Sequence, residues 1–177
     1  GKTKRTVMFA LKIFLRNMMM YRRNRMCSQE CLELSEKIQK SVWSTYEWKS
    51  AGNINIYKSV GNEVSTQFLI HDAEKYSDKV IYYPEQEPKE NVLDVDLVIV
   101  PGVVFDEKRA RYGRGKGYYD RFLDQLPKTT CVIGIAYDFQ VLPYKWKLKL
   151  NEYDIKMDMI ITEKRIIQKR GTLNYKE

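Results

Sequence analysis

The stretch Asp94–Leu123, DVDLVIVPGVVFDEKRARYGRGKGYYDRFL, decides the fold of this 177-residue chain. Residues 97–100 form a short apolar run that Pro101-Gly102 stops, which is typical of a buried strand in a parallel sheet. A basic turn follows, with glycines at positions 113, 115 and 117. Apolar residues then recur at helical spacing over residues 118–126. The stretch therefore predicts a strand, a glycine-rich turn and a helix in succession.

A glycine-rich turn between a strand and a helix can present backbone N–H groups to a phosphate. Alternate glycines leave room for the phosphate, and four cations surround them: Arg111, Arg114, Lys116 and Arg121. The alternative is a basic surface loop whose glycines only allow the chain to turn. Three glycines and four cations between a strand and a helix favour phosphate binding. The P-loop and the dinucleotide fingerprint are excluded, because no Ser or Thr follows Gly-Lys and the glycine spacing differs.

The run PGVVFD followed by RYGRGKGYYDRFL resembles the signature of the 5-formyltetrahydrofolate cyclo-ligase family, also called 5,10-methenyltetrahydrofolate synthetases. The resemblance implies an ATP- and Mg²⁺-dependent conversion of 5-formyltetrahydrofolate into 5,10-methenyltetrahydrofolate, with release of ADP and phosphate. It also implies a three-layer α/β/α sandwich with a mostly parallel, Rossmann-like sheet. Two positions depart from the family pattern, which commonly has Gly at Arg109 and Leu at Tyr112, so the turn before Arg111 is expected to differ in backbone.

The resemblance further implies roles for individual residues. ATP would be bound by Lys12, Arg16, Arg111, Gly113, Arg114, Gly115, Lys116, Gly117, Tyr118 and Tyr119. Of these, Lys116 and Arg114 would act on the charge of the transferred phosphate. Mg²⁺ would be held by Asp120 and Asp154. The residues alone favour Asp120 as an acidic residue at a helix start and the tyrosine pair as part of the core, and only the resemblance favours the magnesium and ligand roles.

Val7 to about Arg23 is predicted to form an amphipathic helix, on which Lys12 and Arg16 share one face because they are four residues apart. These two cations could grip a polyanion or could form a solvated basic face. The family carries a similar Lys-x-x-x-Arg element here, which favours phosphate binding. Phe9 and Phe14 are expected in the core.

The segment 58–64 is predicted to be a loop that opens a helix running to about Tyr76. It resembles a family element that contacts the folate, which implies that Lys58 and Glu63 bind folate together with the tyrosine pair Tyr118 and Tyr119. A helix-start role for Glu63 is the open alternative. Relatives carry an insert that walls the folate pocket near Pro84–Asn91, whereas this chain is shorter there.

Residues 53–57 alternate between polar and apolar side chains, and further apolar runs lie at 79–83, 130–136 and 157–162. These segments predict strands that alternate with helices. Such a pattern indicates an α/β fold with a parallel sheet covered by helices on both faces. The length suits a single domain over residues 1–177, with a polar tail from about residue 163.

Composition limits the other function classes. Residues 1–25 contain eight lysines and arginines and no acidic residue, which accounts for the whole net charge of +8. This basic segment could bind nucleic acid, but no aromatic-plus-basic surface accompanies it, so no nucleic-acid partner is expected. A binding module that retains ATP and folate but has lost or altered turnover is the other alternative.

Residues 7–20 are too charged to span a membrane. Three cysteines without a CxxC pair and one histidine argue against a disulfide scaffold or zinc site. We expect a cytoplasmic monomer that binds small molecules, with organelle import left open.

Overall fold

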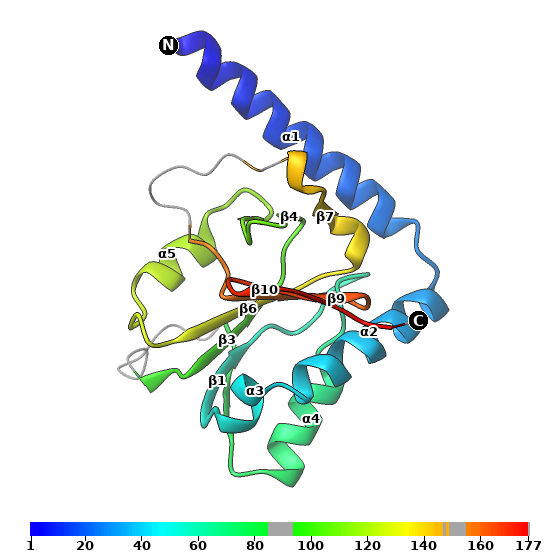
Figure 1. Ribbon diagram of the computed structural model, residues 1–177, viewed down its shortest axis with the longest axis vertical. Coiled ribbons are helices and arrows are strands. Elements are labelled where there is room, and N and C mark those ends of the chain that lie inside the picture. Colours follow the sequence, from blue (N-terminus) through cyan, green and yellow to red (C-terminus); the bar gives the residue numbers. More distant parts are fainter. Residues whose placement is uncertain (85–93, 147, 149–154, 177) are drawn as a thin grey trace.

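The computed structural model describes residues 1–84, 94–146, 148 and 155–176. A seven-stranded sheet lies at its centre, in the order β10-β9-β8-β6-β3-β1-β2 (Figure 1). Neighbouring strands from β2 to β8 run parallel, and β9 and β10 add antiparallel strands at one edge. The strands are β1 (Asn53–Ile56), β2 (Val80–Tyr82), β3 (Leu97–Val100), β6 (Cys131–Ile135), β8 (Met159–Ile161), β9 (Arg165–Gln168) and β10 (Gly171–Asn174). The predicted α/β fold with a mostly parallel sheet is confirmed.

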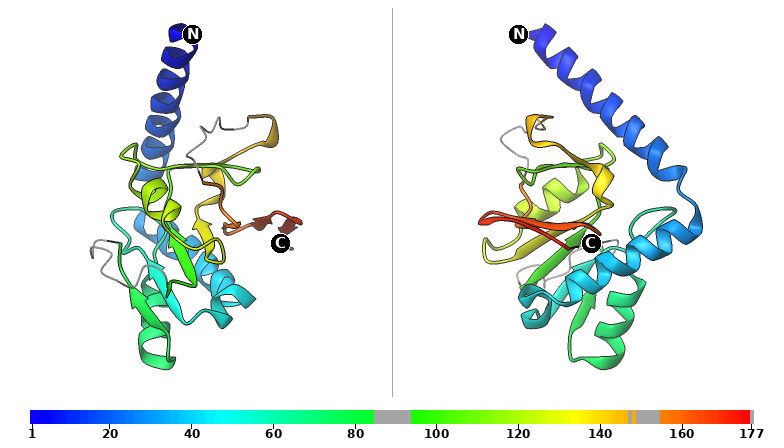
Figure 2. Two further views of the ribbon diagram at one scale, coloured as in Figure 1. Left: turned by 90° about the vertical axis from the view of Figure 1, so that its left-hand side faces the viewer. Right: turned by 45° about the vertical axis from the view of Figure 1, so that its right-hand side comes forward.

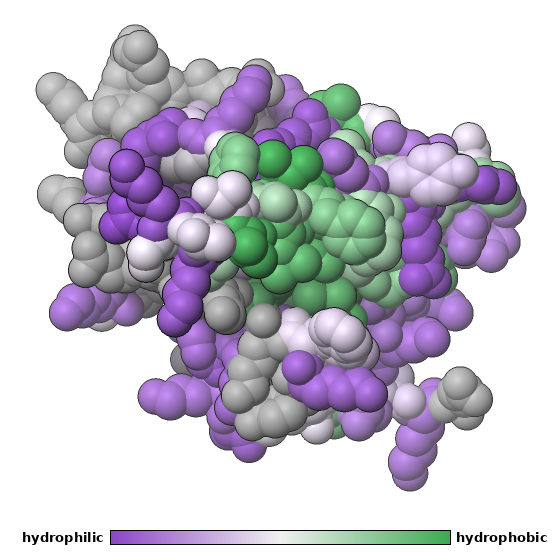
Figure 3. Space-filling view, turned by 90° about the horizontal axis from the view of Figure 1, so that it is seen from above, coloured by the Kyte–Doolittle hydropathy of each residue, from purple (hydrophilic) through white to green (hydrophobic). Residues whose placement is uncertain are grey.

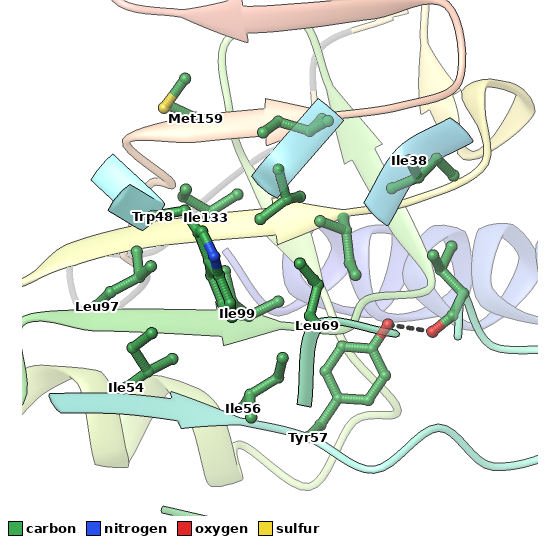
Figure 4. Packing of buried hydrophobic residues seen from close by; sticks show 14 of the residues in the cluster. Ile38, Trp48, Ile54, Ile56, Tyr57, Leu69, Leu97, Ile99, Ile133 and Met159 are labelled. Carbon is green, nitrogen blue, oxygen red and sulfur yellow. Dashed lines mark hydrogen bonds between the residues drawn. The ribbon is translucent and has the colours of Figure 1, made fainter. Parts of the chain in front are cut away.

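Helices cover both faces of this sheet, because side chains along each central strand alternate between two apolar layers. In β3, Leu97 and Ile99 face a core shared with α2 (Ser28–Trp43), α3 (Tyr46–Ser50) and α4 (Gln67–Tyr76). Figure 4 shows this layer, with Trp48 lying against the isoleucines of the sheet. Val98 and Val100 face the opposite layer, which contains Phe122 of α5 (Tyr118–Asp124).

A second, three-stranded sheet lies beside the first and positions the amino-terminal helix. It has the order β5-β4-β7, from β4 (Val104–Asp106), β5 (Arg111–Tyr112) and β7 (Val141–Leu142). Short 3-10 turns at Asp138–Gln140 and Tyr144–Trp146 flank β7. The helix α1 (Lys2–Asn24) packs Met19 against Val104 and Tyr112 of this sheet. This contact anchors only the carboxyl-terminal part of α1, and the amino-terminal part projects beyond the rest of the chain (Figures 1 and 2).

Two expectations from the sequence are wrong. Phe9 and Phe14 are 66% and 61% exposed, because they lie on sides of α1 that no other described residue covers. The segment after residue 163 is not a polar tail but the β9–β10 hairpin. All four residues of β10 are exposed, so this strand lacks the apolar alternation by which strands are recognised.

Arg109 adopts a left-handed backbone, with φ 68°, in the turn between β4 and β5. Its main-chain oxygen accepts a 2.9 Å hydrogen bond from the Met157 N–H, and its Nε donates to the Met157 oxygen at 3.0 Å. The turn thus has a backbone conformation that glycine adopts at no steric cost. The two hydrogen bonds with Met157 hold Arg109 in it.

We predict that Arg109→Ala is less stable than Arg109→Gly by about 1 kcal/mol. Both variants lose the Nε hydrogen bond, and they differ in whether a Cβ must be held at positive φ. Urea unfolding of the two variants measures this difference. Equal stabilities would mean that the turn relaxes away from the left-handed conformation.

Candidate functional site

A cavity of about 690 Å³ opens where the adjacent parallel strands β1 and β3 end. In open α/β sheets the carboxyl ends of the strands are where ligands bind, and the volume falls within the usual range of ligand sites. Five separate parts of the described chain enclose it: α1, the segments after β1, β2 and β3, and the glycine-rich turn.

Every predicted site residue that the structure describes lines this one cavity. They are Lys12, Arg16, Lys58, Glu63, Arg111, Gly113, Arg114, Gly115, Lys116, Gly117, Tyr118, Tyr119 and Asp120. Asp154, the second predicted metal ligand, lies outside the described residues, as does most of the shortened segment after Pro84. Residues that are up to about a hundred positions apart in sequence are therefore brought together, and the cavity is rich in cations.

The amino-terminal helix is joined to the glycine-rich turn by Arg16. Its Nε donates a 2.8 Å hydrogen bond to the Gly113 carbonyl. The Arg16 guanidinium carbon also lies 5.4 Å from the ring centroid of Tyr112, and the Lys12 ammonium lies 4.9 Å from the same centroid. Cations over an aromatic face are stabilised by its negative quadrupole. Tyr112, which departs from the family pattern, thus supports both α1 cations beside the cavity.

The turn itself has a backbone that requires glycine. Gly115 and Gly117 have φ of 99° and 65°, which other residues adopt only with strain. Gly113 is needed for a different reason: a Cβ there would approach Arg111 Nη2 to 2.9 Å. The helix α5 that follows has only seven residues, so its dipole contributes less than the backbone N–H groups and cations of the turn.

Arg111 fixes the start of the turn to the end of β3. Its buried side chain donates from Nε to the Pro101 carbonyl at 2.6 Å and lies over the Tyr119 ring at 4.8 Å. Burial lowers the pKa of Arg111 from its ordinary value, while nearby Tyr119 and Asp120 oppose that shift. An arginine remains protonated under these conditions, so Arg111 brings a fixed positive charge to the cavity wall.

Glu63 and Arg114 face each other across the cavity. Glu63 lies in the loop before α4, so a dipole role in the first turn of that helix is wrong. Its Oε1 accepts a 2.9 Å hydrogen bond from the Val60 N–H and lies 4.0 Å from Arg114 Nη2. The Glu63 side chain is 10% exposed and that of Arg114 is 56% exposed. The carboxylate is thus held in place by its own loop, and the arginine is free to reorient toward a ligand.

Aromatic side chains form another part of the wall. Tyr118 and Tyr119 meet edge to face with centroids 5.2 Å apart, and the Tyr118 hydroxyl donates to the Pro84 carbonyl. Lys58 places its ammonium 4.2 Å from the ring centroid of Tyr83. Tyr119 also packs against the core. The interpretation of the tyrosine pair as core residues is therefore correct for Tyr119, which lines the cavity as well.

Sequence reasoning missed the residues that hold the Pro101–Val103 wall. The Gly102 carbonyl accepts hydrogen bonds from buried Arg23 Nη1 at 3.2 Å and from Gln140 Nε2 at 2.9 Å. Burial lowers the pKa of Arg23 from its ordinary value, and Glu63 opposes the shift. Tyr57, whose hydroxyl donates to the Val64 carbonyl at 2.6 Å, also lines the cavity. Arg23 belongs to a run of basic residues, so no local signal separated it from its exposed neighbours.

The carboxylates that line the cavity suit a metal ion that binds together with a phosphate ligand. Among the described residues, no group of three or more His, Cys, Asp or Glu side chains could hold a metal ion. Asp120 and Glu63 are the carboxylates of the described part of the cavity. Mg²⁺ is commonly held by one or two carboxylates together with phosphate oxygens and water. The cavity therefore fits Mg²⁺ bound to a polyphosphate rather than a preformed metal cage.

Comparisons with known proteins point to one family. The sequence model of the 5-formyltetrahydrofolate cyclo-ligase family matches residues 9–94 and 81–163. The 5-formyltetrahydrofolate cyclo-ligase of Mycoplasma genitalium is 30% identical over 160 residues, covering 83% of this chain and 94% of that protein. The structure of Aquifex aeolicus 5,10-methenyltetrahydrofolate synthetase aligns with a TM-score of 0.77 and 28% identity, covering 94% and 97% of the two chains. That of the Mycoplasma pneumoniae 5,10-methenyltetrahydrofolate synthetase aligns with a TM-score of 0.72 and 28% identity, covering 86% and 99%. In the part of the chain that the structure describes, no helix is both long and apolar enough to span a membrane.

We predict that Gly113→Ala lowers the free energy of unfolding by about 1–3 kcal/mol, because the added Cβ displaces the buried Arg111 guanidinium. A double-mutant cycle isolates this contact: in an Arg111→Ala background, the same Gly113 substitution should lower stability by less than half as much. Denaturant unfolding of the four proteins gives the coupling. Additive effects would show that the turn, rather than Arg111, resists the methyl group.

Proposed function

The chain belongs to the 5-formyltetrahydrofolate cyclo-ligase family and is an ATP-dependent 5-formyltetrahydrofolate cyclo-ligase, and we propose that its two substrates react in the cavity at the ends of β1 and β3. The observation that carries the proposal is the convergence of five chain segments on one cation-rich cavity. The glycine-rich turn, the α1 cations and the Lys58–Glu63 loop all reach it.

The triphosphate of ATP binds between α1 and the glycine-rich turn. Lys12 and Arg16 approach from the helix and are oriented by Tyr112. The backbone N–H groups of residues 113–117, with Arg111 and Arg114, approach from the turn. A polyphosphate placed there neutralises cations that otherwise repel one another, and backbone N–H groups bind its oxygens without steric hindrance.

The chemistry requires alignment and charge neutralisation more than covalent participation by the protein. The formyl oxygen of 5-formyltetrahydrofolate attacks the γ-phosphorus, and the bond from this phosphorus to the bridging oxygen breaks to release ADP. N10 of the folate then attacks the activated formyl carbon and loses its proton to solvent, and the phosphorylated oxygen leaves as phosphate. Lys116 and Arg114, both exposed to the cavity, stabilise the charge that develops on the transferred phosphoryl group.

The folate lies on the side of the cavity formed by Lys58, Glu63 and the tyrosine pair Tyr118 and Tyr119. Glu63 is held by the Val60 N–H and presents carboxylate oxygens, which are acceptors for the N–H groups of a pterin ring. The aromatic faces provide the stacking surface that a flat ring needs. Lys58 supplies a cation suited to the carboxylates of the glutamate moiety.

Asp120 would hold Mg²⁺, together with Asp154, which is outside the described residues. The ion would supply positive charge that offsets the charge of the phosphates. Asp120 lies three residues after Gly117, in the first turn of α5, so its carboxylate lies next to the phosphate-binding backbone.

We predict that Lys116→Ala lowers kcat by about 10²–10³-fold, because it removes a cation that stabilises the transition state. The measurement is the rise of the near-ultraviolet absorption band of methenyltetrahydrofolate when the protein is mixed with 5-formyltetrahydrofolate, ATP and Mg²⁺. Lys128→Ala is the matched control, since Lys128 is exposed and lies outside the cavity. If the Lys116 variant turns over as fast as the wild type, Lys116 has no part in the mechanism. If the wild-type protein produces no absorption band, the proposed site as a whole is wrong.

We predict that Asp120→Asn raises the Mg²⁺ concentration for half-maximal turnover by about tenfold or more, because an amide is a weaker ligand than a carboxylate. Turnover is measured against Mg²⁺ concentration at saturating folate and ATP. Asp124→Asn provides the control, because Asp124 is an exposed acid one turn further along the same helix and does not line the cavity. If both variants shift equally, the effect is one of overall charge and Asp120 is not a ligand.

A further inference from the structure

The loop that carries Glu63 is attached to the end of α1 by one side chain. Asn62 Nδ2 donates hydrogen bonds to the main-chain oxygens of Arg23 and Met26, at 2.8 Å and 3.0 Å. A primary amide has two N–H donors, and both are used here. Carbonyls in the last turn of a helix lack the N–H groups of a following turn. The Asn62 amide therefore closes the carboxyl-terminal end of α1.

Glu63 follows Asn62 directly, and its carboxylate is held by the same short turn. The Val60 N–H donates to Glu63 Oε1 at 2.9 Å, and the Glu63 N–H donates to the Val60 carbonyl at 3.2 Å. Residues 60–63 are thus closed on themselves and can move as one unit. Asn62 fixes where this unit lies relative to α1, and it thereby fixes the position of the Glu63 carboxylate in the cavity wall.

The helix α1 connects this turn to the cations on the other side of the cavity. Arg16 donates to the Gly113 carbonyl in the glycine-rich turn, and Arg23 follows seven residues later on the same helix. Seven residues of α-helix span about 10 Å. Arg23 also donates to the Gly102 carbonyl, and its guanidinium is close enough to Glu63 for the carboxylate to oppose the lowering of the pKa of Arg23. One helix is therefore attached to both the phosphate side and the folate side of the proposed site.

The position of α1 is held from the side that faces the cavity. Seen from the end of the molecule at which α1 projects, hydrophobic side chains form one continuous area bordered by hydrophilic ones (Figure 3). Val7 and Phe14 of α1 are 62% and 61% exposed, so the described part of the chain covers little of this helix face. The contacts on the inner side come from Met19, Arg23 and the amide of Asn62. A shift of α1 caused by a bound phosphate would thus reach Asn62.

The residues that follow the turn have attachments of their own. The Tyr57 hydroxyl donates to the Val64 carbonyl at 2.6 Å, and Thr66 Oγ1 donates to the Tyr57 carbonyl at 2.7 Å. These two bonds hold the chain between β1 and α4 without help from Asn62. Loss of the Asn62 amide should therefore release residues 60–63 from α1 and leave the fold in place.

We propose that Asn62 is a positioning residue that couples the two halves of the cavity, so that ATP and 5-formyltetrahydrofolate bind with positive synergy. A triphosphate bound to Lys12 and Arg16 fixes α1, and Asn62 then fixes the turn that presents Glu63 to the folate. Coupling between two sites is reciprocal, so bound folate strengthens ATP binding by the same factor. The inference rests on the substrate positions proposed above and adds a residue that does not itself line the cavity.

Arg114 offers a second connection between the two halves. Its Nη2 lies 4.0 Å from Glu63 Oε1, and its side chain is 56% exposed. Exposed ion pairs contribute little, because water and salt screen them. The hydrogen bonds of Asn62 are shorter and partly buried. The geometry therefore favours Asn62 as the main connection, and variants at Asn62 separate the two routes.

Isothermal titration calorimetry measures the coupling directly. 5-Formyltetrahydrofolate is titrated into the 177-residue protein in the presence of Mg²⁺, with and without an ATP analogue in which NH replaces the oxygen between the β- and γ-phosphorus atoms. This analogue binds as ATP does but does not transfer its phosphoryl group. The wild type should bind the folate about fivefold more tightly, or better, when the analogue is present. In Asn62→Ala and Asn62→Asp this ratio should fall below about twofold.

The two substitutions separate the donors of Asn62 from its shape. Asn62→Asp keeps the shape of the side chain but removes both donors, so it should behave like Asn62→Ala. Both should raise the KM for 5-formyltetrahydrofolate about fivefold or more and leave kcat within about threefold, because Asn62 contacts no reacting atom. Asn174→Ala is the matched control, since Asn174 is exposed in β10 and lies outside the cavity. It should leave the synergy and both kinetic constants unchanged.

A wild type that turns over, but whose affinity for the folate does not depend on the analogue, would overturn this inference and leave the proposed function standing. Synergy that survives in both Asn62 variants would also overturn it and would assign the coupling to Arg114. Loss of the folded circular-dichroism spectrum in both variants would show that Asn62 supports the fold, which contradicts a positioning role. If the wild type binds neither the folate nor the analogue, the proposed site fails together with the inference.

Discussion

The whole site depends on the attachment of one long helix to two carbonyl oxygens at the ends of β3 and β5. Arg16 donates to the Gly113 carbonyl and Arg23 to the Gly102 carbonyl, and these two arginines are seven residues apart on the same side of α1. A helix with a fixed rise per residue can satisfy both acceptors only in one register. The bonds therefore set how far Lys12 lies from the glycine-rich turn. Charged donors to backbone acceptors are also stronger than neutral pairs, particularly where water is excluded.

This attachment is one of several contacts that allow a cluster of cations to lie together. Lys12, Arg16, Arg111, Arg114 and Lys116 line a single cavity, and like charges at such distances repel one another. Most of this repulsion is offset locally. Arg16 and Arg111 donate hydrogen bonds to main-chain oxygens. Lys12 and Arg16 lie over the aromatic face of Tyr112. Glu63 lies near Arg114. Lys116 is exposed, so water screens it until a phosphate arrives. The arrangement is preorganised for a polyanion, because the backbone and aromatic groups already hold the cations in place.

The strands β3, β6 and β8 could be predicted from sequence because each one is buried on both faces and therefore consists of apolar or small residues. Leu97–Val100 is the clearest example, since its four residues divide between two cores. The three-stranded sheet could not be predicted, because strands of two or three residues such as Arg111–Tyr112 carry no periodicity. The cavity residues were predictable where they share one short motif, as in the glycine-rich turn. Arg23 and Gln140 were not, since their function is to hold a carbonyl that is distant in sequence, and the chain gives no local sign of that partner.

The two faces of α1 are under different physical constraints, and that difference explains why the sequence misled us about its phenylalanines. A helix that packs on a domain is expected to bury its largest apolar residues, so Phe9 and Phe14 were assigned to the core. In α1 the face that meets the domain instead carries arginines and a lysine, because it forms one wall of the cavity for which we propose an anionic ligand. The bulky apolar residues are consequently displaced to the sides and to the outer face. The first three turns have little tertiary packing of their own, and helices without such packing are marginal in water. The site that we propose for phosphate does not depend on these turns alone, because Lys12 and Arg16 are held by their own contacts with Tyr112 and Gly113.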